Sequence, residues 1–339
     1  MKALVLKAPG QASIESVSEP RLVQGDVLLR VRMIGLCGSD LNSYRGKNPL
    51  VRYPRIPGHE IAATIVEAAA PLPSGLAVGG DVTISPYTSC GRCASCLRAR
   101  PNACANNQTL GVQRDGALTE FIAVPPEKLF AASSLSLKEL CLVEPLTVGF
   151  HAVARGRVTL SDKVAILGCG GVGLGAIAAC HFAGATIIAV DVSDEKLAIA
   201  RQAGAAHTIH SAVHLLHDRL LELTNGFGPD VIIEAIGTPE TFRAAVEEVA
   251  FSGRVVYIGY AKEPVAYESR LFVQKELDIL GSRNALPADF HSVIHMLEQK
   301  KFPIDAAVGS IAPLDEAPEI FAAWSADPSH FSKILITIP

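Results

Sequence analysis

The feature that most restricts the fold of this chain is a regular alternation of apolar runs and alanine-rich segments that begins at Lys163. The apolar runs are continuous rather than alternating, so each predicted strand should be buried on both faces. A strand that is followed each time by a helical segment is typical of a parallel sheet covered by helices. The pattern predicts a doubly wound α/β domain with strands at 164–168, 186–190, 207–210, 231–237, 254–259 and 277–281.

The residues before about 148 follow a different pattern. Short alternating runs, such as 27–33, are separated by turns rich in glycine and proline, which indicates an all-β region. Short elements return after about residue 295, and the chain ends in a predicted strand at 333–337. We therefore expect a β-rich domain formed by residues 1–148 and 296–339, with the α/β domain, residues 149–295, inserted into it.

A glycine-rich turn follows the first strand of the α/β region and opens a helix. Its glycines permit a tight turn and the close approach of a pyrophosphate, which the helix N-terminus stabilises. Asp191 follows the next strand, where a carboxylate binds the adenosine ribose hydroxyls and repels a 2′-phosphate. The sequence therefore predicts an NAD site, and the alternative is a βα turn without a ligand. The predicted contacts are Gly168, Gly170, Gly171, Val172, Gly173 and Asp191.

Four of the eight cysteines lie close together in the sequence, at positions 90, 93, 96 and 104. The amino-terminal segment lacks the pattern of a secretory signal, so we expect a cytoplasmic protein with reduced thiols. Four thiolates without a water position suit a closed, tetrahedral structural zinc site. An iron–sulfur cluster needs the same number of ligands and is the alternative. The predicted ligands are Cys90, Cys93, Cys96 and Cys104.

A second set of potential ligands is chemically mixed. Cys37 lies in the motif GLCGSD, His59 and Glu60 lie in GHE, and Glu144 precedes a proline. A Cys, His and carboxylate set is typical of a catalytic zinc that keeps one position open. Taken singly, each residue also has an ordinary structural explanation, since a lone cysteine usually packs in a core.

In this order, the motifs GLCGSD, GHE, the four-cysteine loop, Glu-Pro and GCGGVG resemble the zinc-containing medium-chain alcohol dehydrogenases over essentially the whole chain. The sorbitol, threonine and L-galactonate 5-dehydrogenase branch is the most similar. The resemblance implies a GroES-like catalytic domain, an inserted Rossmann domain, two zinc ions per chain and NAD. It also implies Cys37 and His59 as catalytic zinc ligands, with either Glu60 or Glu144 as the third, and Asp40 as a residue that orients a ligand.

The resemblance implies oxidation of a secondary alcohol. The zinc would lower the pKa of the substrate hydroxyl, and hydride would pass to the nicotinamide ring. Ser39, two residues after Cys37, is the expected first proton relay. Many relatives have histidine at the position of Asn42, and an asparagine cannot relay a proton by titrating. Water or the cofactor ribose would then carry the proton onward.

The substrate prediction depends on a basic loop. Residues 42–57 include four basic residues and no acid, and arginine binds carboxylates bidentately. The stretches that contain Tyr44, Arg45 and Arg283 look most like the sugar-acid members of the family. We therefore predict a sugar acid or polyol, with an L-galactonate-like compound favoured and these three residues as candidate contacts. A solvated basic loop is the alternative.

The formal net charge of −4 argues against nucleic acid or an anionic membrane as a partner. We expect a homodimer or homotetramer, because the predicted strand at 277–280 could pair across a two-fold axis. Three alternative functions remain: a sorbitol or threonine dehydrogenase, a zinc-stabilised NAD-binding sensor with little turnover, and a zinc-free relative of the quinone reductases. The two zinc motifs argue against the last.

Overall fold

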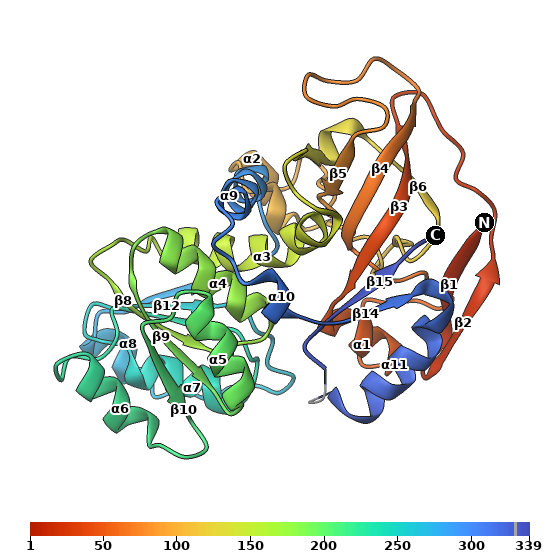
Figure 1. Ribbon diagram of the computed structural model, residues 1–339. Coiled ribbons are helices and arrows are strands. Elements are labelled where there is room, and N and C mark those ends of the chain that lie inside the picture. The colour runs from red at the N-terminus through yellow and green to blue at the C-terminus, as the bar shows by residue number, and fades with distance from the viewer. Residues whose placement is uncertain (329–330) are drawn as a thin grey trace. The chain divides into compact units, whose positions relative to one another are not determined.

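The computed structural model of the 339-residue chain describes residues 1–328 and 331–339. They form two compact units (Figure 1). Unit 1 consists of residues 1–144, 286–298 and 304–339, and unit 2 consists of residues 145–285 and 299–303. The first division falls within the helix α3 (Leu137–Arg155).

Unit 1 is built on a seven-stranded sheet with the order β14-β15-β3-β4-β5-β7, in which β6 also pairs with β3. In β3 the exposed Arg30 and Arg32 alternate with the buried Leu29 and Val31, so one face of the strand enters the core. Strands β1 and β2 form a separate two-stranded sheet. The strands of unit 1 are β1 (Lys2–Ala8), β2 (Gln11–Ser16), β3 (Val27–Leu36), β4 (Glu60–Ala68), β5 (Asp81–Ile84), β6 (Phe121–Val124), β7 (Leu129–Ala131), β14 (Val308–Pro313) and β15 (Lys333–Thr337).

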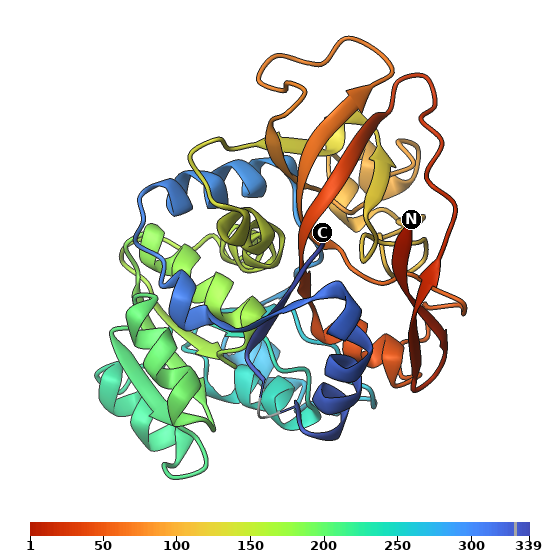
Figure 2. The ribbon, with the colours of Figure 1, turned by 45° about the vertical axis from the view of Figure 1, so that its right-hand side comes forward.

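The helices of unit 1 are mostly short. Helix α11 packs against α1 and against β2, which pairs only with β1 (Figure 2). The helices are α1 (Gly38–Tyr44), α2 (Ala94–Leu97), α9 (Pro287–Glu298), α10 (Ile304–Ala307) and α11 (Ala317–Ala326), with short 3₁₀ turns at Pro101–Ala103, Pro126–Lys128 and Leu314–Glu316.

Unit 2 is a six-stranded parallel sheet with the order β10-β9-β8-β11-β12-β13, and it confirms the predicted doubly wound domain. The strand order reverses at β8, whose neighbours are β9 and β11, and ligands of such sheets bind at the carboxyl ends of the strands at this point. The strands are β8 (Lys163–Leu167), β9 (Thr186–Asp191), β10 (His207–His210), β11 (Val231–Glu234), β12 (Arg254–Tyr257) and β13 (Asp278–Gly281). The helices are α4 (Gly171–Phe182), α5 (Asp194–Gln202), α6 (Leu216–Leu223), α7 (Pro239–Glu248) and α8 (Arg270–Gln274).

The units differ from the predicted domains at three places: residues 145–148 and 299–303 lie in unit 2, and residues 286–295 lie in unit 1. The predicted α/β domain, residues 149–295, includes most of α9, but the structure places residues 286–298 in unit 1. The reason is aromatic packing: the ring of Phe290 stacks on that of Phe130, with 4.5 Å between centroids. The Ser134 hydroxyl also donates to Glu298 at 2.7 Å. The pattern of apolar residues in a helix does not say which sheet the helix covers.

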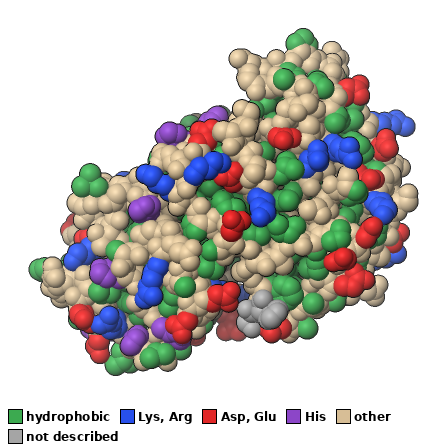
Figure 3. Space-filling view, in the orientation of Figure 1, with side chains coloured by type: hydrophobic (Ala, Val, Ile, Leu, Met, Phe, Trp, Pro, Cys, Tyr) green, Lys and Arg blue, Asp and Glu red, His purple; other side chains and the backbone are tan. Residues whose placement is uncertain are grey.

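The surface carries mixed charge. On the face shown in Figure 3, basic and acidic side chains are interspersed rather than gathered by sign. This agrees with the small net charge of −4. Among the described residues, no helix is both long and apolar enough to cross a membrane.

Candidate active site and dinucleotide site

The mixed ligand set is assembled by the pairing of two strands. Cys37 follows the last residue of β3, and His59 and Glu60 lie at the start of β4. The antiparallel register places Gly35 opposite Glu60, so the two motifs meet. The potential ligand atoms of Cys37, His59 and Glu60 all lie within 4.8 Å of one another. A Cβ at position 35 would lie 2.0 Å from Glu60 Oε2, which explains why the first residue of GLCGSD is glycine.

Asp40 fixes both halves of this group. Its buried carboxylate accepts hydrogen bonds from the Cys37 amide at 2.9 Å and the Gly58 amide at 3.3 Å. One of its oxygens lies 3.7 Å from His59 Nδ1, which is too long for a hydrogen bond but close enough for electrostatic attraction. Burial raises the pKa of Asp40, and His59 opposes that rise. Asp40 is therefore placed to orient the ligand group.

The site concentrates negative charge. Burial lowers the pKa of His59, but Asp40, Cys37 and Glu144 together raise it well above its ordinary value. Burial raises the pKa of Glu144 to about 7, and Glu60 adds to that rise. Lys333, which pairs with Glu60, balances part of this negative charge, and a further cation would balance the rest. The donor set and its charge therefore fit a divalent metal such as zinc.

The two candidate carboxylates have different partners. Lys333 Nζ, from β15, donates to both oxygens of Glu60 at 2.7 and 2.6 Å and to the Leu36 carbonyl at 3.2 Å. Glu144, from α3, accepts a hydrogen bond from the Tyr87 hydroxyl. Within the described residues, the ligand group includes Glu60 but not Glu144. No sequence pattern marks Lys333 or Tyr87 as part of the site, because each lies far along the chain from its partner.

Ser39 has an unsatisfied hydroxyl. In the described part of the chain its Oγ is buried and has no hydrogen-bond partner. A buried hydroxyl without a partner costs free energy, so it fits a group that bonds to a ligand. Ser39 lies in the first turn of α1, next to the ligand group that begins at Cys37.

The four cysteines of the loop 90–104 also come together. Their sulfur atoms all lie within 4.8 Å of one another. Cys93 Sγ is 3.5 Å from Cys96 Sγ and 3.8 Å from Cys104 Sγ. Sulfurs at 2.3 Å from one tetrahedral zinc would lie about 3.8 Å apart, whereas a disulfide needs about 2.0 Å. The amides of Cys90 and Asn106 each donate to Cys104 Sγ at 3.3 Å, as suits a thiolate.

The glycine-rich turn has the steric requirements of a dinucleotide site. Gly168 has φ +97°, a conformation that side chains rarely adopt. A Cβ on Gly173 would lie 1.8 Å from the Gly168 carbonyl oxygen, so the turn can pack onto α4 only with glycine there. Gly170, the N-cap of α4, has open space where its Cβ would be. Gly171 and Val172 begin the helix, whose free N-terminal amides suit a phosphate.

Asp191 ties this turn to the neighbouring strand. It is the last residue of β9, and its carboxylate accepts the Cys169 amide at 2.8 Å. The other carboxylate oxygen accepts the amides of Val192 and Ser193 at 2.8 and 3.1 Å. The predicted ribose-binding residue therefore lies beside the predicted phosphate-binding turn.

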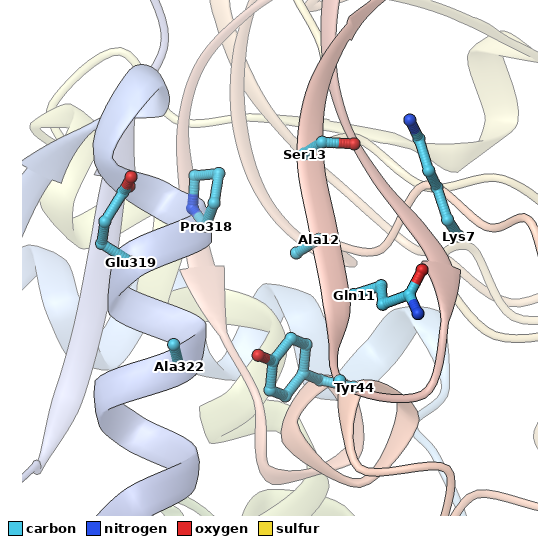
Figure 4. Close-up of a pocket in the computed structure, with 9 residues that line it drawn as sticks. Lys7, Gln11, Ala12, Ser13, Tyr44, Pro318, Glu319 and Ala322 are labelled. Atoms are coloured by element: carbon cyan, nitrogen blue, oxygen red, sulfur yellow. The ribbon is translucent and has the colours of Figure 1, made fainter.

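Two of the three candidate substrate contacts also pack against other parts of unit 1. Tyr44 is buried, with its ring 5.6 Å from Phe321, and it lines a groove of about 500 Å³ between β2 and α11 (Figure 4). Arg45 donates to the Ser325 hydroxyl at 3.0 Å. Both side chains thus hold α1 against α11.

Arg283 remains a candidate contact. It follows β13 and lines an open cavity of about 370 Å³ in unit 2, together with Tyr257, Gly259 and Tyr260.

Comparisons with known proteins identify the family of the chain. Residues 23–134 match the family described as the alcohol dehydrogenase GroES-like domain, and residues 171–299 match the zinc-binding dehydrogenase family. The chain belongs to the zinc-containing medium-chain alcohol dehydrogenases. It is an oxidoreductase that acts on CH–OH donors and uses zinc and NAD. The predicted family, fold class and enzyme class are confirmed.

Three similar proteins span the whole or most of the chain. An uncharacterized zinc-type alcohol dehydrogenase-like protein of Haemophilus influenzae is 32% identical over 98% of both chains. The L-galactonate-5-dehydrogenase of Escherichia coli is 27% identical over 90% of this chain and 89% of its own. A solved structure, described as a short chain alcohol dehydrogenase (rspB) of Escherichia coli CFT073 complexed with NADH, is 28% identical with a TM-score of 0.90 over 99% of each chain.

Proposed function

We propose that this dehydrogenase oxidises a secondary hydroxyl of a sugar acid or polyol and transfers the hydride to NAD, with an L-galactonate-like sugar acid favoured. The observation that supports this proposal most is the convergence of Cys37, His59 and Glu60 beside the unsatisfied hydroxyl of Ser39. The similarity to an L-galactonate-5-dehydrogenase supports the substrate class. A sorbitol or threonine dehydrogenase is the alternative within the same chemistry.

The residues that we propose as zinc ligands are Cys37, His59 and a carboxylate. Glu60 is the preferred third ligand because it lies within the ligand group, and Glu144 is the alternative. A zinc ion bound there would supply Lewis acidity, which lowers the pKa of a substrate hydroxyl. The cysteines of the loop 90–104 would hold the second, structural zinc, which stabilises a loop that has few buried residues.

We propose Ser39 as the residue that accepts the substrate's hydroxyl proton. Ser39→Ala should lower kcat by about a hundredfold, because a positioned proton-transfer group contributes 10²–10⁴-fold. The matched control is Ser43→Ala in the same helix, since the Ser43 hydroxyl donates to the Ser39 carbonyl at 2.8 Å and so has a structural partner. Steady-state kinetics give kcat for both variants. A kcat within twofold of the unchanged enzyme for Ser39→Ala would remove Ser39 from the relay.

We propose that Asp191 selects NAD. Asp191→Ala should lower kcat/KM for NAD by about tenfold, since hydrogen bonds to a charged group contribute about 1.5–3 kcal/mol. Asp191→Asn keeps a hydrogen-bond acceptor but removes the negative charge that repels a 2′-phosphate. Its main effect should therefore be a higher kcat/KM for NADP. The measurement is the ratio of kcat/KM for the two cofactors in both variants. An unchanged ratio would show that another residue makes the choice.

The substrate class is tested by NADH formation on a panel of aldonic acids, the polyols of the same carbon skeleton, and threonine. Arg283, which lines an open cavity in unit 2, is one of the residues that we propose for binding a carboxylate. We expect aldonic acids to have the higher kcat/KM. Turnover of polyols alone would overturn the sugar-acid preference and keep the mechanism. No turnover on any substrate, despite NADH binding, would favour the sensor alternative.

A homo-oligomer also remains a proposal. In the sheet of unit 2, β13 is an edge strand, and its Ile279 is 40% exposed. An exposed edge presents unpaired backbone groups to another strand. Sedimentation of the protein would show whether it forms the dimer or tetramer that we expect.

A further inference from the structure

A fully buried carboxylate ends the strand β11. Glu234 is 0% exposed and follows three apolar residues. In the register with β8 it lies opposite Leu167, the residue before the glycine-rich turn. A carboxylate is costly to bury, so its presence in an otherwise apolar strand calls for a specific role.

One oxygen of Glu234 organises the turn that follows β11. Oε1 accepts hydrogen bonds from the Ile236 amide at 2.9 Å and the Gly237 amide at 2.7 Å. It also accepts the Thr241 hydroxyl at 2.8 Å, which links the turn to the first turn of α7. These three bonds fix the path of residues 235–238.

The other oxygen has no partner among the described residues, although it is buried. It lies under the turn that follows β12, where a Cβ on Gly259 would be 2.5 Å away. The Glu234 carbonyl accepts the amides of Ile258 and Gly259 at 2.9 and 3.3 Å. Since an unsatisfied buried acceptor costs free energy, stability alone does not explain the carboxylate.

The turn that Glu234 holds also touches the glycine-rich turn. A Cβ on Gly168 would lie 2.6 Å from the Ile236 side chain, and the Ala235 amide donates to the Leu167 carbonyl at 2.9 Å. Ile236 and Tyr260, from the turns after β11 and β12, are 49% and 77% exposed. The carboxyl end of the sheet therefore presents two turns that meet at Glu234: its side chain holds the turn after β11, and its backbone carbonyl holds the turn after β12.

We propose that the Glu234 side chain is a positioning group for dinucleotide binding, which holds the turn after β11 in the form that receives the cofactor. This inference rests on the proposed assignment of the glycine-rich turn and Asp191 as the NAD site. Glu234 acts through the backbone of its neighbours. Its loss should therefore weaken binding of the cofactor and leave the chemical step nearly unchanged.

The test compares Glu234→Ala and Glu234→Gln in the zinc-loaded, full-length enzyme. We expect Glu234→Ala to raise the NADH Kd and the KM for NAD by about tenfold or more, with kcat at saturating NAD within about threefold. Glu234→Gln keeps an acceptor for the three bonds and should restore the Kd to within about threefold of the unchanged enzyme. NADH fluorescence titration gives the Kd, and thermal unfolding shows whether each variant is folded.

A control variant separates positioning from general stability. Asp230, just before the opposite end of β11, accepts the Lys163 amide at 2.7 Å. Asp230→Ala should lower Tm and leave the NADH Kd within about threefold. If Glu234→Ala does not fold, Gly259→Ala should raise the Kd instead, because its Cβ would meet both the Glu234 carboxylate and the Gly237 amide that this carboxylate holds.

Two results would overturn the inference. One is an unchanged NADH Kd in a folded Glu234→Ala or Gly259→Ala variant. The other is an equal rise in Kd for Asp230→Ala, which would mean a purely structural role. If the unchanged enzyme itself did not bind NADH, the proposed NAD site would fail first, and this inference with it.

Discussion

Replacing Cys37 with alanine should remove one of the two zinc ions that we expect per chain and lower turnover by about a thousandfold. Lewis-acid activation is worth several kcal/mol, and each 1.4 kcal/mol corresponds to about a factor of ten in rate. His59 and a single carboxylate would leave the metal with too few protein ligands. Cys37 lies at the end of a strand rather than in the core, so the fold should survive.

The measurement combines zinc analysis with NADH formation in one preparation. Cys180→Ala is the matched control, because Cys180 is buried within α4 of unit 2 and lies outside both ligand groups. It should keep both zinc ions and its kcat. A Cys37→Ala variant that retained two zinc ions and full turnover would show that the catalytic site lies elsewhere.

Replacing Lys333 with methionine should destabilise the chelator-treated protein by about 3–5 kcal/mol, the usual cost of breaking a buried ion pair. Lys333 and Glu60 are 11% and 1% exposed at their side chains, with 2.6 Å between the charged atoms. Burial lowers the pKa of Lys333, but Glu60, Cys37 and Cys141 together raise it above its ordinary value. Without Lys333, the Glu60 carboxylate would be buried and unpaired when no metal is bound.

Denaturant unfolding gives the free-energy change, and two variants serve as controls. Lys138→Met removes an exposed lysine that lies 3.3 Å from Asp305, and exposed pairs contribute about 0–1 kcal/mol. The double variant Lys333→Met, Glu60→Gln should recover much of the lost stability, because the unpaired charge is gone. Equal effects for Lys333→Met and Lys138→Met would contradict the account of the buried pair.

Local sequence patterns were sufficient for most of the fold. The strands of unit 2 lie within a few residues of the predicted runs, because a strand buried on both faces leaves a continuous apolar signature. The grouping of the four cysteines of the loop 90–104 could also be predicted, because residues so close in sequence can meet without long-range contacts. Cys37, His59 and Glu60 are farther apart in sequence, and the pairing of β3 with β4 brings them together.

Contacts between residues far apart in the sequence could not be predicted from local patterns. Lys333 is 273 residues from Glu60, and Tyr87 is 57 residues from Glu144, so no local pattern marks either pair. The basic loop does not show which of its residues bind substrate, because an arginine has the same sequence context whether it faces a ligand or a neighbouring helix. Only the packing of α11 shows that Arg45 is engaged by Ser325.

The central claim is that the group of Cys37, His59 and Glu60 holds a zinc ion on which turnover depends. The most direct test follows zinc content and NADH formation in the same sample, before chelation, after it, and after zinc is restored. We predict two zinc ions per chain at the start, loss of turnover when the first is removed, and recovery when zinc returns. Full turnover in a chain that contains no zinc would contradict the account.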